Sequence, residues 1–172
     1  RRHEVLRTTF ATTADGRPVQ VIGPPAPVPV PVIDLSALGA GDREAAAGRL
    51  ARAEGGRPFD LARGPLLRCR LLRLSADEAV ALFTAHHVVS DEWSSAILVR
   101  ELTALYGAWV RGEAASLPEL PVQYADYAVW QREWLEGDVM ERQLAYWRER
   151  LAGAPPVLEL PTDRPRSAAV SD

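Results

Sequence analysis

Two strand-length segments, 66–74 and 79–85, constrain the fold of this chain more than any other feature. Both are largely apolar, and the four residues Ser75-Ala76-Asp77-Glu78 between them have the composition of a turn. The sequence therefore predicts an antiparallel hairpin, whose second strand leads directly into His86-His87-Val88-Val89-Ser90-Asp91. Alternation along the first strand puts Cys69 on the same face as its leucine neighbours, and a buried packing role is expected for this lone cysteine.

Composition excludes several classes of function. The 172 residues have the length of one ordinary domain, and the net charge of −3 includes no basic block typical of a nucleic-acid surface. All 20 basic residues are arginine, so neither Schiff-base chemistry at lysine nor a Walker-type phosphate loop is possible. No apolar run approaches the roughly 20 residues that cross a bilayer. A single cysteine fits a reducing cytosol, so we expect a cytoplasmic protein that binds neither nucleic acid nor membrane.

The remaining elements predict an α+β fold. A second hairpin is expected from Leu6 to Thr13 and from Val19 to Ile22, followed by a proline-rich extended connector or edge segment at 23–31. A helix is expected from Asp42 to Glu54, ended by two glycines. Three apolar stripes at helical spacing follow the histidines, and we expect their aromatic side chains to be core: Leu98, Leu102, Leu105 and Trp109; Tyr124, Tyr127, Trp130, Trp134 and Leu135; Met140, Leu144, Trp147 and Leu151.

The histidine pair permits three interpretations. Both side chains could be packing residues, which is the usual fate of a lone histidine. A shared metal ion is disfavoured, because adjacent strand residues point to opposite faces and no second pair of ligands has suitable spacing. One histidine could instead act as an acid, a base or a hydrogen-bond partner near neutral pH. Asp91 and Glu92 fall in the first turn of the next helix, where acidic residues are favoured.

Three segments in order resemble the condensation domains of nonribosomal peptide synthetases, members of the chloramphenicol acetyltransferase-like superfamily. His86 to Asp91 resembles the His-His-x-x-x-Asp-Gly motif of that family, and Arg2 to Phe10 resembles its upstream Arg-His-Glu-x-Leu-Arg-Thr-x-Phe segment. Tyr124 to Gln131 is similar to its downstream Tyr-x-Asp-aromatic-Ala-x-Trp segment, and the run from Tyr146-Trp147 to Asp163-Arg164-Pro165 also resembles the family.

The resemblance implies a two-lobed domain with a tunnel between the lobes. Residues 1–172 would be most of the first lobe, in a mixed or antiparallel sheet flanked by helices, with the family's first motif and second lobe absent. The missing initiator methionine also suggests a piece of a longer polypeptide. We therefore expect the 172 residues alone to show no condensation activity.

The implied reaction joins two carrier-bound substrates in the biosynthesis of peptide secondary metabolites such as antibiotics. A donor acyl or peptidyl thioester and an acceptor aminoacyl thioester would be presented on the phosphopantetheine arms of two peptidyl carrier proteins, with an adenylation domain adjacent in cis. No cofactor or metal would be bound by the chain itself. The sequence around the histidine motif most resembles the condensation-domain subtype that joins two L-configured residues.

The resemblance also implies roles for individual residues. His87 would face the tunnel, as a general base or as a group that positions the amine, and His86 would support it from behind. Asp91 would be structural and pair with an arginine, for which Arg2 and Arg7 are candidates.

Glu92 departs from the family pattern, since it stands where the family usually has glycine. It is therefore a candidate determinant of selectivity. It also keeps open a degenerate, condensation-like module that recruits other proteins, while an epimerisation domain is the nearest enzymatic alternative.

Overall fold

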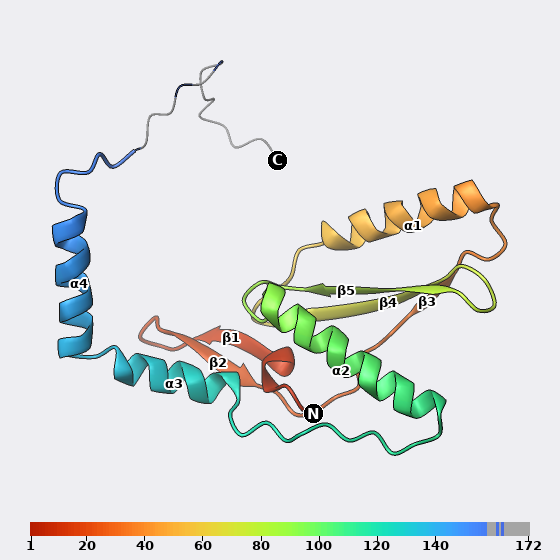
Figure 1. Ribbon diagram of the computed structural model, residues 1–172, viewed down its shortest axis with the longest axis horizontal. Coiled ribbons are helices and arrows are strands. Elements are labelled where there is room, and N and C mark those ends of the chain that lie inside the picture. Colours follow the sequence, from red (N-terminus) through yellow and green to blue (C-terminus); the bar gives the residue numbers. More distant parts are fainter. Residues whose placement is uncertain (158–160, 162, 164–172) are drawn as a thin grey trace. The chain divides into compact units, whose positions relative to one another are not determined.

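The hairpin predicted from the sequence lies at the centre of the fold. β4 (Leu67–Arg73) and β5 (Ala79–Ala85) pair antiparallel, with Leu67 opposite Ala85 and Arg73 opposite Ala79 (Figure 1). The computed structural model describes residues 1–157, 161 and 163. Contacts divide the chain into two compact units, Arg1–Val129 and Trp130–Asp172, and both hairpins belong to the first.

A third strand joins this sheet in parallel. β3 (Val32–Asp34) pairs with β4, and α1 (Ala40–Gly55) connects the two strands, which gives a strand–helix–strand unit. Proline lacks an amide donor, and β3 begins directly after Pro31, whose carbonyl already accepts a hydrogen bond from Leu71 at 3.0 Å. The predicted edge segment therefore ends in a short strand, and the parallel pairing is a feature that the proline pattern did not predict.

The core lies between α1 and the three-stranded sheet. Leu35, Ala46 and Leu72 are buried together, and five partly buried side chains pack around them: Ile33, Ala47, Leu50, Leu74 and Leu82. Leu72 faces α1, whereas Cys69 is buried on the opposite face of β4, where burial raises the pKa of its thiol.

The N-terminal segment forms a separate two-stranded sheet. A 3₁₀ helix, η1 (Glu4–Arg7), precedes β1 (Thr8–Thr12), which pairs antiparallel with β2 (Pro18–Ile22). The second predicted hairpin is therefore confirmed, although its first strand begins two residues late because η1 occupies the start of the predicted range. Its backbone is tied to the loop before β4, since the Phe10 amide donates to the Leu61 carbonyl at 2.8 Å.

Three helices follow the hairpin, as the stripes predict. They are α2 (Glu92–Val110), α3 (Tyr124–Trp134) and α4 (Asp138–Arg150). Among the described residues, no helix is long and apolar enough to span a membrane. The mixture of strands and helices confirms the predicted α+β class.

The prediction that the helical aromatics are core is wrong for the described part of the chain. Trp109 on α2 is 74% exposed. The same holds, to a lesser degree, for the other predicted positions: Tyr124, Tyr127, Trp130, Trp134 and Trp147. Helical spacing identifies side chains that share a face, but it carries no information on whether the same stretch of chain supplies the surface that covers them.

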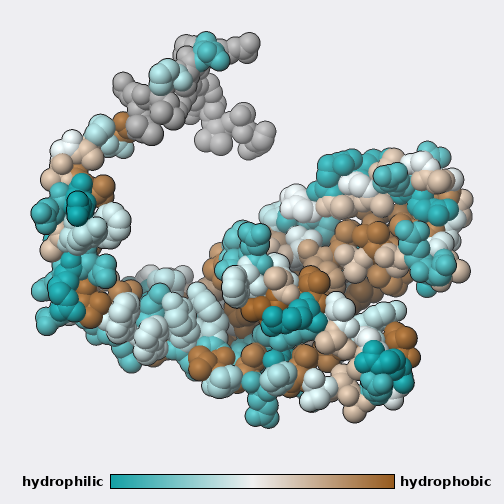
Figure 2. Space-filling view, viewed as in Figure 1, coloured by the Kyte–Doolittle hydropathy of each residue, from teal (hydrophilic) through white to brown (hydrophobic). Residues whose placement is uncertain are grey.

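β5 is the edge of its sheet within the described residues. The strand order is β3-β4-β5, so β5 has β4 as its one neighbour there, and none of its seven residues is charged. Val80 and Phe83 are both more than one-third exposed. Figure 2 shows apolar residues over the sheet between α1 and α2.

Candidate functional site

A tight turn at the end of β5 carries the two histidines (Figure 1). The His86 amide donates to the Leu66 carbonyl at 3.0 Å, and the Val89 amide donates back to the His86 carbonyl at 3.0 Å. Val89 is buried, whereas the adjacent His87 is exposed. These hydrogen bonds anchor the backbone of the turn to the hairpin. The His87 side chain remains accessible.

Asp91 caps the helix that follows. Its carboxylate accepts from the Ser94 amide at 2.8 Å and from the Ser94 hydroxyl, while its own amide donates to that hydroxyl at 3.2 Å. This reciprocal capping box satisfies amides that the first turn of α2 leaves unpaired. The hydrogen bonds from Ser94 hold the pKa of Asp91 below its ordinary value.

The predicted pairing of Asp91 with Arg2 or Arg7 is wrong. The Arg2 Nε atom lies 3.0 Å from Glu101 Oε1, and an Arg7 Nη atom lies 2.6 Å from Glu4 Oε1. Arg7 also donates to the Gly23 carbonyl. An exposed carboxylate that is already capped by a helix start needs no counter-ion, so both arginines serve other acids.

Glu101 joins α2 to the N-terminal segment. It is 8% exposed, and its second carboxylate oxygen lies 2.6 Å from the His3 Nε2 atom while the first accepts from Arg2. The start of α3 is attached to the same segment, because Gln123 accepts from the Glu4 amide and donates to the Arg2 carbonyl. These bonds bring together segments about 100 residues apart in sequence.

A cavity of about 270 Å³ lies where these segments meet. Its lining includes His87 and Asp91 from the histidine motif, His3 from the upstream segment, and Tyr124 from the downstream one. Its remaining lining side chains are mostly apolar: Val5, Leu6, Val88, Val89, Ser90, Ser94, Ile97 and Leu98. Two imidazoles and a carboxylate thus share one apolar pocket, which is an arrangement suited to moving or holding a proton.

His86 lies outside the lining of that cavity. Its Nδ1 atom accepts from the Val88 amide at 3.0 Å, and its ring meets Phe59 edge to face, with centroids 5.9 Å apart. The neutral ring must therefore carry its proton on Nε2. The two histidines have different surroundings, as expected for neighbours at the end of a strand.

Glu92 is exposed at the first position of α2 and is not part of the cavity lining. No group of three or more metal-ligating side chains occurs among the described residues. Sequence reasoning missed His3, Glu101 and Phe59. His3 lies in the upstream motif segment and Glu101 on α2, and their contact depends on how α2 meets the N-terminal segment, which no local pattern encodes.

Glu101 should make stability depend on pH. Burial raises its pKa, but hydrogen bonds and charge from His3 and Arg2 outweigh burial, so its folded pKa lies below the ordinary value of 4.5. Such a group contributes stability above its unfolded pKa and loses that contribution as pH falls through the folded pKa. In the complete domain, the Tm difference between wild type and Glu101→Gln should therefore be largest near neutral pH and shrink below about pH 4.5. A difference independent of pH would contradict this assignment.

Comparison with known proteins identifies the same family as the three motif segments. The family model for the condensation domain matches residues 1–171. One of the linear gramicidin synthase proteins of Brevibacillus parabrevis is 56% identical over 167 residues, which are 97% of this chain and 3% of that protein. Phosphinothricin tripeptide synthetase PhsC of Streptomyces viridochromogenes is 52% identical over 171 residues, 99% of this chain and 16% of that protein.

Solved structures give the same result. The X-domain from teicoplanin biosynthesis has 37% sequence identity and a TM-score of 0.80, over 97% of this chain and 36% of that one. This chain thus spans a small part of the length of its curated relatives and about a third of that solved domain. The predicted α+β lobe of the chloramphenicol acetyltransferase-like fold is confirmed. A match over nearly the whole chain, together with three motif segments around one cavity, shows that this chain belongs to the condensation-domain family.

Proposed function

We propose that the protein containing this chain forms an amide bond between two carrier-bound thioesters, and that residues 1–172 are most of the first lobe of its condensation domain. The observation that carries the proposal is that one cavity is lined by His87 and by Asp91, the residue that caps the start of α2. An exposed imidazole on an apolar pocket, with its backbone held by the hairpin, suits proton transfer near neutral pH.

The proposed step is an acyl transfer. The amine nitrogen of the acceptor attacks the carbonyl carbon of the donor thioester, the C–N bond forms, and the C–S bond of the tetrahedral intermediate breaks. The His87 ring accepts a proton of the attacking amine, or a hydrogen bond from it, and the departing thiolate of the donor arm takes up one proton. The atoms balance without a metal, an oxidant or a further cofactor.

The other predicted residues act through His87 in this proposal. His86 holds the turn from behind, as its contacts with Val88 and Phe59 suggest. Asp91 fixes the start of α2 beside the cavity, and Arg2 supports it through Glu101. Arg7 acts less directly: it pairs with Glu4 of η1 and donates to the Gly23 carbonyl in the connector after β2.

The partners follow from the reaction. Donor and acceptor substrates arrive on phosphopantetheine arms of two peptidyl carrier proteins, and an adenylation domain in cis supplies the acceptor amino acid. We place this machinery in the cytoplasm. The test is the intact synthetase with both carriers loaded, in which mass spectrometry should detect the condensed product on the acceptor carrier. Its absence, or an inverted α-carbon without a new bond, would overturn the proposal, and the latter result would identify an epimerisation domain.

A second candidate is a condensation-like module that recruits another protein without catalysis. The X-domain from teicoplanin biosynthesis, a similar structure, has been solved in complex with OxyB. Glu92 in place of the usual glycine is the feature of this chain that favours this candidate.

Glu92→Gly separates the two candidates. Because the Glu92 side chain is exposed and lies outside the cavity lining, we expect product formation by Glu92→Gly to stay within about twofold of wild type. The readout is the initial rate of product formation in the intact synthetase. If wild type makes no peptide and Glu92→Gly does, the non-catalytic candidate is correct.

A further inference from the structure

Outside the candidate site, one buried carboxylate forms ion pairs with three arginines. Glu54, in the last turn of α1, is 3% exposed. Its carboxylate lies 3.1 Å from Arg57 Nη1 and 2.8 Å from Arg70 Nε, and it contacts Arg68 Nε as well. The proposed reaction uses none of these residues, although a buried ion pair is costly to assemble unless its geometry is well satisfied.

The Arg68 guanidinium is fixed in its plane. Besides the Glu54 carboxylate, it donates to three backbone carbonyls at the end of α1 and in the following loop: Pro58 at 3.1 Å, Arg57 at 2.9 Å and Glu54 at 3.2 Å. Such a fork cannot rotate without breaking several charge-assisted bonds. Its flat face is left for Phe59, with Arg68 Cζ lying 3.8 Å from the ring centroid.

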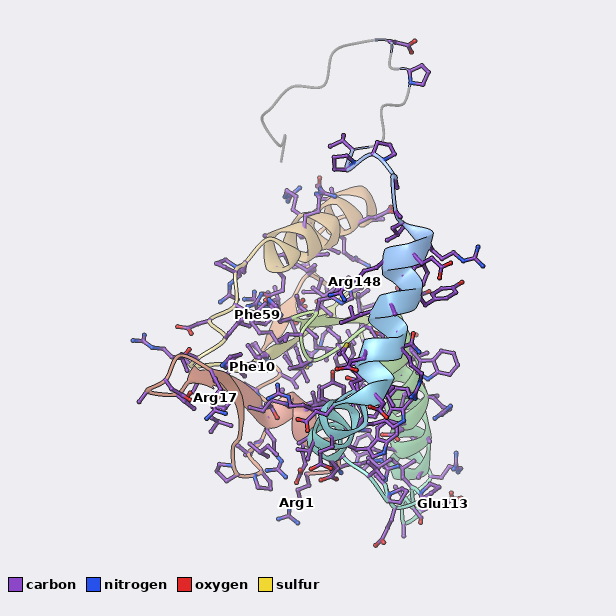
Figure 3. The ribbon with its side chains drawn as sticks, turned by 90° about the vertical axis from the view of Figure 1, so that its left-hand side faces the viewer. Arg1, Phe10, Arg17, Phe59, Glu113 and Arg148 are labelled. Carbon is purple, nitrogen blue, oxygen red and sulfur yellow. The ribbon has the colours of Figure 1, made fainter. Side chains whose placement is uncertain are left out.

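Phe59 transmits this restraint to the histidine motif. Its segment lies between α1 and β4, close to the sheet (Figure 3). The Phe59 and His86 rings are 5.9 Å apart at an interplanar angle of 89°, an edge-to-face contact. The Val88 amide holds the His86 Nδ1 atom, so the imidazole is restrained both by this amide and by Phe59.

We infer that Phe59 is a positioning residue for the turn that carries His87, and that Arg68 and Glu54 hold the Phe59 ring against His86. The series Glu54–Arg68–Phe59–His86 connects the end of α1 to the turn between β5 and α2. The effect of this series on catalysis rests on the proposed function. The restraint on the His86 ring is independent of the proposed function, because it depends only on the contacts between these side chains.

The test compares Phe59→Leu, Phe59→Tyr and Phe10→Leu in the intact synthetase. Phe10 is the matched control, since it is also half-buried but lies on β1. Phe59→Leu should reduce kcat about 10-fold, because a small misplacement of a catalytic group is costly, and leave KM for the acceptor carrier unchanged. It should also accelerate deuterium exchange at the His86 C2–H, located by tandem mass spectrometry. Phe59→Tyr should restore both values, and Phe10→Leu should change neither.

Arg68→Lys provides a second, independent variant. It keeps the charge but loses the fork that holds Phe59, so His86 exchange should again accelerate. Wild-type exchange at His86 in both Phe59→Leu and Arg68→Lys would overturn the inference, and Arg68→Lys decides it if Phe59→Leu does not fold. If the wild-type synthetase makes no peptide, the proposed function fails, while the exchange rates still decide the positioning role.

Discussion

His87→Ala in the intact synthetase should lower the single-turnover rate of product formation by about 100-fold or more. His87 is the exposed histidine of the motif and lines the cavity, and removing a positioned acid–base group typically costs this much. The rate is measured with both carriers loaded in excess, so that substrate delivery does not limit it. Far-ultraviolet circular dichroism and Tm should match wild type, because an exposed side chain contributes little to packing.

His87→Asn distinguishes the two roles that remain open for this side chain. Asparagine can donate a hydrogen bond but does not titrate near neutral pH. If His87 only positions the amine, His87→Asn should retain much more activity than His87→Ala. Wild-type rates in His87→Ala would remove this residue from the mechanism altogether.

The largest loss of stability is expected for Glu54→Ala. Removal of the carboxylate leaves Arg57, Arg68 and Arg70 facing one another, two of them largely buried. Breaking a buried ion pair from one side costs about 3 kcal/mol or more in the free energy of unfolding. Urea unfolding of the complete condensation domain measures the loss, and a decrease in the midpoint without a change in slope would assign it to stability.

Glu44→Ala is the matched control, since Glu44 is exposed on the same helix. Its free energy of unfolding should stay within about 0.5 kcal/mol of wild type. Equal effects of the two substitutions would mean that the arginines around Glu54 find other partners at no cost.

Local features of the fold were predictable because local patterns determine them. The β4–β5 hairpin, α1 with its glycine end and α2 after Asp91 all follow from turn residues, apolar periodicity and capping. The parallel pairing of β3 was not predictable, because a three-residue strand has no periodicity to read and its partner lies about 40 residues away.

The site was predictable in its components and less so in its contacts. The three motif segments contain most of the residues that line the cavity, although the role of His3 was missed. The expected partner of Asp91 was wrong because Ser94 is nearer and sufficient. Both Arg2 and Arg68 pair with buried glutamates whose burial depends on how a helix packs. Nothing in the local sequence distinguishes Glu54 or Glu101 from the exposed glutamates of the same helices.

The uncharged strand β5, which is an edge of its sheet within the described residues, matters to anyone who recombines peptide synthetases. Native sheet edges usually carry lysine, proline or an inward-pointing charge, which discourages another strand from adding. Ala79–Ala85 has none of these, and it ends directly at the turn that carries His86 and His87. A chimera whose junction leaves this edge open would be lost to insoluble material before its turnover could be compared. Crossover points for module exchange should therefore keep β5 with the sheet neighbours of its own domain.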